Sequence, residues 1–169
     1  MAGPVSASSS SSGNCWVIWL SFAGGLVLSV TPMPEFMQYG RPLWLALLLT
    51  YWTLYLPHRV GMTTAWLLGL ALDVLGGTLL GQNALVLALV SFLVQLLQPR
   101  LRMFHNWQQS LVLLVVLGLA QLVQLWLYVL AGHRPPPTLL FLLPALVSAL
   151  LWPWLFVILR ALRLRLRVG

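Results

Sequence analysis

Acidic residues are almost absent from this sequence of 169 residues, which contains only Glu35 and Asp73 against nine arginines and no lysine. Glycoside hydrolysis uses paired carboxylates, and calcium or magnesium sites use several oxygen ligands, so enzymes and metal sites rich in carboxylates are excluded. The single cysteine, Cys15, excludes an intramolecular disulfide and a zinc site built from cysteines. We therefore expect no metal and no cofactor.

Charge of either sign is also scarce, at 7% of the residues, whereas apolar residues make up 60%. A soluble domain has roughly 25% charged residues, and a folded chain of this size could not cover its surface with so few polar side chains. The net charge of +7 could suggest nucleic acid, but the arginines stand at the edges of apolar runs and form no basic groove. The sequence therefore predicts an integral membrane protein that does not bind nucleic acid.

A Ser-rich start and six apolar runs organise the chain. Residues 1–15 have no apolar periodicity and are predicted to be a disordered tail. The six runs cover residues 16–31, 43–56, 62–75, 79–97, 110–131 and 138–159. A membrane helix needs about 20 apolar residues, so the short second and third runs could instead be re-entrant segments. Because polar edge residues can lengthen both runs and a short hydrophilic turn joins them, we predict an all-α integral membrane fold, a six-helix transmembrane bundle over residues 16–159.

The arginines predict the orientation of this bundle. With six spans both termini lie on one side, together with the second and fourth loops. That side has seven arginines and the opposite side has two, namely Arg59, Arg100, Arg102, Arg160, Arg163, Arg165 and Arg167 against Arg41 and Arg134. Cytoplasmic segments carry the excess of arginine, so both termini are expected in the cytoplasm. The four arginines of the basic tail, residues 160–169, are predicted to contact anionic lipid headgroups.

Asp73 is the one acidic residue inside an apolar run. An ionised carboxylate near the bilayer centre costs about 3 kcal/mol by insertion scales, so such a residue normally has a partner inside the protein. Arg41 begins the second run on the same outer side, and we predict an Arg41–Asp73 pair, with Arg134 as the second candidate. Asp73 is interpreted as a structural latch; contact with a helix of another protein, or a proton or cation site, are the alternatives.

Glycines recur around this acid at intervals of four residues, so that Gly69, Asp73, Gly77 and Gly81 would share one stripe of a helix. Small residues at this spacing let a second helix approach closely. We therefore predict a close-packing seam with one polar latch. The Gly76-Gly77 pair is expected to loosen or end the helix, which would place Gly81 on the next element.

Two other motifs contain proline. Pro57, His58 and Arg59 form the predicted cytoplasmic turn between the second and third runs, where proline ends the helix and the basic groups can meet lipid phosphates. Trp152 and Pro153 lie in the sixth run, and a proline there is expected to kink the helix and shape a packing surface.

Four stretches in order resemble one known family. They are WVIWLSF at residues 16–22, LPHRV at 56–60, GLALDVLGGTLLG at 69–81 and LWPW at 151–154. Together they are similar to the rod shape-determining protein MreD family of rod-shaped Gram-negative bacteria, from about residue 16 to residue 160. The Ser-rich start differs from the short basic N-terminus typical of that family.

The resemblance implies a non-enzymatic inner-membrane subunit of the cell-elongation complex. Members of the family associate with MreC and help couple the MreB filament to lateral peptidoglycan synthesis by RodA and its class B transpeptidase. The family is also considered similar in fold to the six-helix substrate-binding components of energy-coupling-factor transporters, and it has no established catalytic residues. We accordingly expect the glycine seam and its neighbouring helices to present a surface to MreC.

The alternative function is a membrane protein that binds a small molecule or a lipid-linked precursor. Such a protein would need an outward-facing pocket with several convergent polar groups. The candidate polar residues Gln82, Asn83 and Asn106 are scattered in the sequence and do not indicate one. An intramembrane enzyme is disfavoured further, because no nucleophile and base stand at a suitable spacing.

Overall fold

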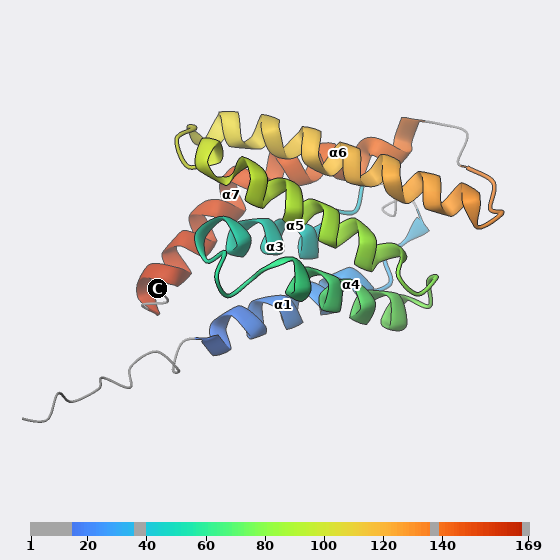
Figure 1. The fold of residues 1–169 in the computed structure, drawn as a ribbon, viewed down its shortest axis with the longest axis horizontal. Coiled ribbons are helices and arrows are strands. Elements are labelled where there is room, and N and C mark those ends of the chain that lie inside the picture. Colours follow the sequence, from blue (N-terminus) through green and yellow to red (C-terminus); the bar gives the residue numbers. More distant parts are fainter. Residues whose placement is uncertain (1–14, 36–39, 136–138, 167–169) are drawn as a thin grey trace, which may run out of the picture.

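The computed structural model of the chain describes residues 15–35, 40–135 and 139–166. Within these ranges the chain forms six α-helices and one short 3-10 helix (Figure 1). They are α1 (Cys15–Val30), α3 (Trp44–Tyr55), α4 (Met62–Gly76), α5 (Gln82–Leu101), α6 (Asn106–Leu130), the 3-10 helix η1 (Leu139–Leu142) and α7 (Leu143–Arg165). Each α-helix coincides with one of the six predicted apolar runs, which confirms the all-α fold class.

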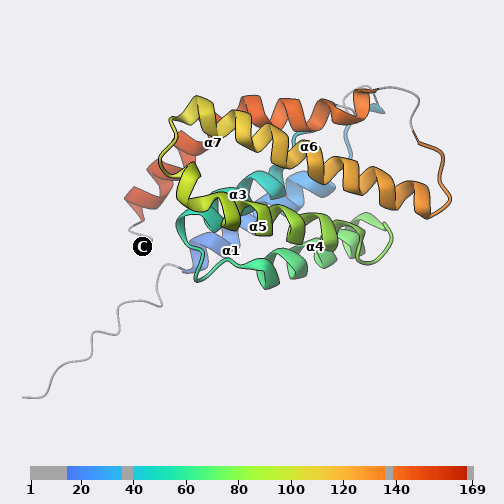
Figure 2. The same cartoon turned by 45° about the horizontal axis from the view of Figure 1, so that its top comes forward.

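Successive helices run in opposite directions between the two ends of an elongated bundle (Figures 1 and 2). Helices α6 and α7 pack together on one side, α1 and α4 lie on the other, and α3 and α5 lie between them. This alternation places the α3–α4 and α5–α6 turns at the same end as the start of α1 and the end of α7. The α4–α5 turn and the end of α6 lie at the opposite end.

Helix α3 forms the centre of the core, with ten consecutive buried residues from Leu45 to Leu54. It is enclosed by α1, α5 and α7. A helix that is apolar on every side is stable only where protein or lipid surrounds it completely, and here the surroundings are protein. On the α7 side, the ring of Tyr51 packs edge-on against Phe156, with 5.8 Å between ring centroids.

The helices differ in length. Three segments are long and apolar enough to cross a membrane, namely α5, α6 and η1 together with α7, with 20, 25 and 27 residues. Helices α1, α3 and α4 have only 16, 12 and 15 residues. At a rise of 1.5 Å per residue, α3 extends about 18 Å, whereas the hydrocarbon core of a bilayer is about 30 Å thick. Within the described residues the structure therefore has six apolar helices, of which three have full spanning length.

Both ends of the short helix α3 are hydrogen-bonded by other helices. The backbone N–H of Leu43 donates to Ser148 Oγ at 2.8 Å. The carbonyl of Leu54 accepts from Gln98 Nε2 at 2.9 Å and from Arg102 Nη2 at 2.8 Å. The terminal turns of a helix contain backbone groups without intrahelical partners, and lipid offers none. These side chains therefore allow α3 to end inside the bundle.

Several boundaries differ from the sequence prediction. Helix α5 continues through Pro99 to Leu101, and α6 begins at Asn106, four residues before the predicted run. Helix α7 continues to Arg165, so most of the predicted basic tail belongs to the last turns of a helix. The predicted disordered tail, apart from Cys15, and Arg167 lie outside the described residues.

Candidate functional site

Asp73 lies in the last turn of α4 and is only 1% exposed. Its carboxylate accepts five hydrogen bonds, all from the turn and the first residues of α5. Thr78 Oγ1 donates at 2.8 Å, the backbone N–H of Gly81 at 2.9 Å and that of Ala84 at 3.3 Å. Asn83 donates twice, from its backbone N–H at 3.0 Å and from Nδ2 at 2.8 Å. The buried charge is thus surrounded by donors.

These bonds make Asp73 a cap for the helix that follows its own. Asn83 and Ala84 are the second and third residues of α5, and their N–H groups are those that a capping side chain normally binds. A carboxylate also interacts favourably with the positive end of the helix dipole. The carboxylate therefore accepts hydrogen bonds from the free N–H groups at the start of α5 and holds this helix against the end of α4.

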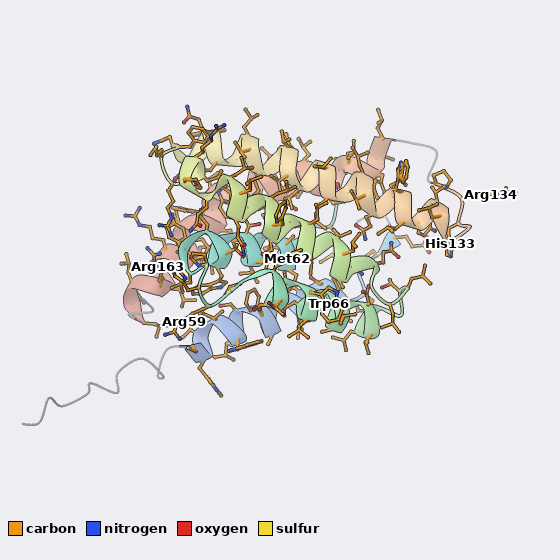
Figure 3. The ribbon with its side chains drawn as sticks, in the orientation of Figure 1. Arg59, Met62, Trp66, His133, Arg134 and Arg163 are labelled. Atoms are coloured by element: carbon orange, nitrogen blue, oxygen red, sulfur yellow. The ribbon has the colours of Figure 1, made fainter. Side chains whose placement is uncertain are left out.

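The predicted Arg41–Asp73 pair is wrong. Arg41 Nη2 donates to the carbonyls of Leu28 at 2.8 Å and Thr31 at 3.1 Å, and also to that of Ser29, at the end of α1. Arg134 lies with His133 beyond the end of α6 (Figure 3), and within the described ranges neither arginine bonds to Asp73. Asp73 meets the positive start of α5 and Arg41 meets the negative end of α1. Both charges are therefore stabilised by helix termini without forming a pair.

The four-residue glycine stripe is divided between a helix and a turn. A Cβ atom on Gly69 would lie 2.2 Å from the Cα of Ala84 and 2.7 Å from the carbonyl oxygen of Asn83, so α4 and α5 touch there through their backbones. Gly77 ends α4 with φ of 64°, and Gly81 precedes α5 with φ of 98°. The seam therefore lies between two helices of this chain, and the turn needs glycine for its left-handed backbone.

A polar network extends from Asp73 to a third helix. Asn83 Nδ2 also donates to Thr78 Oγ1 at 3.2 Å, and Gln124 Nε2 on α6 donates to Asn83 Oδ1 at 3.2 Å. We call Asp73, Thr78, Asn83 and Gln124 the Asp73 cluster. Thr78 and Gln124 were not predicted from the sequence as site residues, and Asn83 was expected to be isolated. The available signal was the placement of Thr78 and Asn83 on either side of a glycine-containing turn after the acid.

The Pro57 turn lies at the other end of the bundle, where Arg59 and Arg163 are found (Figure 3). The N–H groups of Arg59 and Val60 both donate to the carbonyl of Leu56 at 3.0 Å, and Val60 is buried. His58 and Arg59 are exposed, and Arg59 Nη1 donates to Cys15 Sγ at the start of α1. Across the described part of the chain, no three His, Cys, Asp or Glu residues lie close enough to hold a metal ion.

Trp152 and Pro153 lie within α7, where Trp152 faces the core. The indole Nε1 of Trp152 donates to Gln109 Oε1 at 3.4 Å, and Gln109 Nε2 donates to the carbonyl of Leu101 at 2.8 Å. Trp154, on the other side of Pro153, is exposed. Only the first of the two tryptophans is therefore a packing residue of the bundle, and it connects α7 to α6.

The last turns of α7 place arginines at the same end as the Pro57 turn. The guanidinium of Arg163 lies 4.4 Å from the centroid of the Tyr55 ring, within the range of a cation–π contact. Arg160 and Arg165 are exposed. Arg163 thus connects the end of α7 to the end of α3. The charges of Arg160 and Arg165 remain on the surface of the bundle.

Comparison with known proteins assigns the chain to a family. The family model described as rod shape-determining protein MreD matches residues 10–162. The rod shape-determining protein MreD of Haemophilus influenzae is 33% identical over 154 residues, which cover 90% of this chain and 94% of that protein. No solved structure matches the chain significantly. The family match includes the whole Asp73 cluster and the Pro57 turn, and the chain therefore belongs to the MreD family of rod shape-determining proteins.

Proposed function

We propose that this chain is a non-enzymatic inner-membrane subunit of the rod complex, which maintains cell shape by binding MreC. Through MreC it helps couple MreB to lateral peptidoglycan synthesis by RodA and its class B transpeptidase. The family match over residues 10–162 carries this proposal, because the family is defined by a role in rod shape. The positions of Asp73 and Arg41, each at a helix end, also favour a protein that acts by contact.

The proposed topology has six membrane-spanning segments with both termini in the cytoplasm. Three observations support it. Successive helices alternate in direction (Figure 1), Arg59 and Arg163 lie at one end, and Arg134 lies at the other (Figure 3). The end with more arginine is the cytoplasmic one in most membrane proteins. There, Arg160, Arg163, Arg165 and Arg167 would meet the anionic headgroups of the inner leaflet.

The surface proposed for MreC lies outside the glycine seam, because Gly69 and Asp73 are buried against α5. Next to them, four exposed apolar side chains surround the α4–α5 turn. They are Val74, Leu75, Leu79 and Leu80, which we call the outer-turn surface. Asp73 holds this turn in place through its bonds to Thr78 and Gly81. An apolar surface at the outer end of the bundle suits the outer end of the MreC membrane helix.

Two variants with MreC co-purification as the readout test this proposal. Leu80→Asn makes the outer-turn surface polar at a side chain that is 76% exposed, and Asp73→Ala removes the bonds that hold the turn. Both are expected to lower MreC recovery severalfold and to produce rounded cells. The matched control is Leu130→Asn, because Leu130 is 73% exposed at the same end of the bundle but belongs to α6. Normal MreC recovery and rod shape in both variants would refute the proposed surface.

A further inference from the structure

A cavity of about 530 Å³ lies inside the bundle at the end where α1 and α4 finish and α3 and α5 begin. Pockets that bind small molecules commonly have volumes of about 300–1,000 Å³. More than half of the lining residues are leucine, valine or alanine, and most of these come from α3, α4, α5 and α6. The polar lining residues are Ser29, Arg41, Thr78, Asn83, Gln121 and Gln124. The cavity therefore combines an apolar body with several polar groups.

Among the described residues that line the cavity, Gln121 has a buried side-chain oxygen without a partner. It is 4% exposed, and its Oε1 atom is buried and accepts no hydrogen bond within the described residues. Leaving such a group unsatisfied costs about 1–3 kcal/mol. The carboxamides of Gln98 and Gln109, by contrast, bind backbone carbonyls. Gln121 lines the cavity, so a molecule in the cavity is the partner that its position allows.

Gln124 supplies a second acceptor, and the Asp73 cluster determines its direction. An ionised carboxylate can only accept, so Asn83 must turn Nδ2 toward Asp73 and Oδ1 toward Gln124. Gln124 must then donate from Nε2 to Asn83, which leaves Gln124 Oε1 without a partner among the described residues. Gln121 and Gln124 are three residues apart on α6, so they lie on one face of the helix. Two glutamine side chains, each with an amide oxygen that has no partner among the described residues, thus line the cavity from the same face of α6.

The charges around the cavity disfavour an ionic ligand. Arg41 lines the cavity, but its guanidinium is bound to the carbonyls at the end of α1. Asp73 lies behind Thr78 and Asn83, both of which line the cavity, so a molecule in the cavity would meet a negative charge on one side and the positive charge of Arg41 on another. An anion would gain from Arg41 and lose from Asp73, because both interactions are strong where water is scarce. A neutral molecule avoids this opposition.

We propose that this cavity binds a neutral amphiphile from the bilayer. Its hydroxyl or amide N–H groups donate to Gln121 and Gln124, and its apolar part packs against the leucine and valine side chains of the wall. The site provides the convergent polar groups that a protein binding small molecules needs. This inference does not depend on the binding of MreC, because Gln121 and Gln124 lie on α6 and are not part of the outer-turn surface, which shares only Leu75 with the cavity wall.

Photolabelling of the full-length chain in lipid nanodiscs tests the proposal. The probe is a monoacylglycerol, a neutral lipid with two free hydroxyls, with a diazirine in its acyl chain. We expect peptides from the cavity wall to be labelled, and unlabelled monoacylglycerol to compete better than the fatty-acid methyl ester, which has no donor. Gln121→Leu should lower labelling about five- to tenfold, as expected for the loss of one or two hydrogen bonds. The matched control Gln95→Leu changes a half-buried glutamine of α5 outside this cavity and should leave labelling unchanged.

A second measurement separates loss of binding from loss of fold. Replacing an unpartnered buried polar group with an apolar one of similar size is neutral or stabilising, so Gln121→Leu should unfold no more readily than the unmodified chain. Ala120→Leu, which extends a buried wall residue into the cavity, should also lower labelling. Unchanged labelling in both variants, equal competition by the methyl ester, or stronger competition by a lysophosphatidic acid would overturn the proposal.

Discussion

Replacing Asp73 with alanine removes the acceptor of five hydrogen bonds at the start of α5. Loss of a helix N-cap costs about 0.5–2 kcal/mol, and each buried donor left unpaired adds about 1–3 kcal/mol. Water can reach part of the exposed α4–α5 turn, so only some of these donors stay unpaired. We therefore expect the free energy of unfolding to fall by about 3–5 kcal/mol.

The same substitution distinguishes a helix cap from an ion pair when it is combined with Arg41→Gln in a double-mutant cycle. The two side chains bind different helices and share no hydrogen-bond partner. Their effects on the free energy of unfolding should therefore add to within about 0.5 kcal/mol. The charge exchange Arg41→Asp with Asp73→Arg should be more damaging than either single change, because each charge would then meet a helix end of its own sign.

Unfolding in mixed micelles with increasing sodium dodecyl sulfate, followed by the fluorescence of the nine tryptophans, measures these changes. Glu35→Ala is the control, because Glu35 is the other acidic residue and is exposed. A coupling energy above about 1.5 kcal/mol between Asp73 and Arg41, or recovery of stability in the exchanged variant, would show that the two charges act as a pair.

Two predictions concern packing and orientation. Gly69→Ala should lower the free energy of unfolding by about 3 kcal/mol or more, because its Cβ would meet the backbone of α5, whereas Gly118→Ala, with nothing within 4 Å, should be neutral or slightly stabilising in the same assay. In a Cys15→Ser background, His58→Cys should react with a membrane-impermeant thiol reagent only from the cytoplasm, and His133→Cys only from outside. The reverse pattern would contradict the proposed topology.

Hydropathy and helix-breaking residues were sufficient to locate the six α-helices of the described part of the chain, because an apolar run inside a membrane must satisfy its backbone groups within a helix. Helix ends were less predictable. Asn106 begins α6 within a polar segment that hydropathy assigns to a loop, although a Gln108 Oε1 contact to the N–H of His105 supports that turn. Arg165 ends α7 inside the supposed tail for the same reason: hydropathy reports depth in the membrane and not helical conformation.

The candidate site was predicted only in part. The need of Asp73 for a partner follows from its burial, but the choice of an arginine overlooked the backbone as a donor. Backbone donors became available because Gly77 and Gly81 adopt positive φ and fold the start of α5 back over the carboxylate. Gln121 could not be predicted as a site residue, because the sequence does not distinguish a buried glutamine that has a hydrogen-bond partner from one that has none.

Helix α3 imposes an order on the biogenesis of the protein. The N–H of Leu43, directly before α3, is satisfied by Ser148, and the carbonyl of Leu54, in the last turn of α3, is satisfied by Gln98 and Arg102. All three of these side chains are synthesised after α3 itself. At 12 residues, α3 is also too short to rest in lipid as an independent span. The helices of the nascent chain therefore cannot each take up a final position as soon as they are synthesised. The central helix α3 reaches its final environment only after α5 and α7 have entered the membrane. The bundle can therefore close around α3 only after α7, the last helix, has been synthesised.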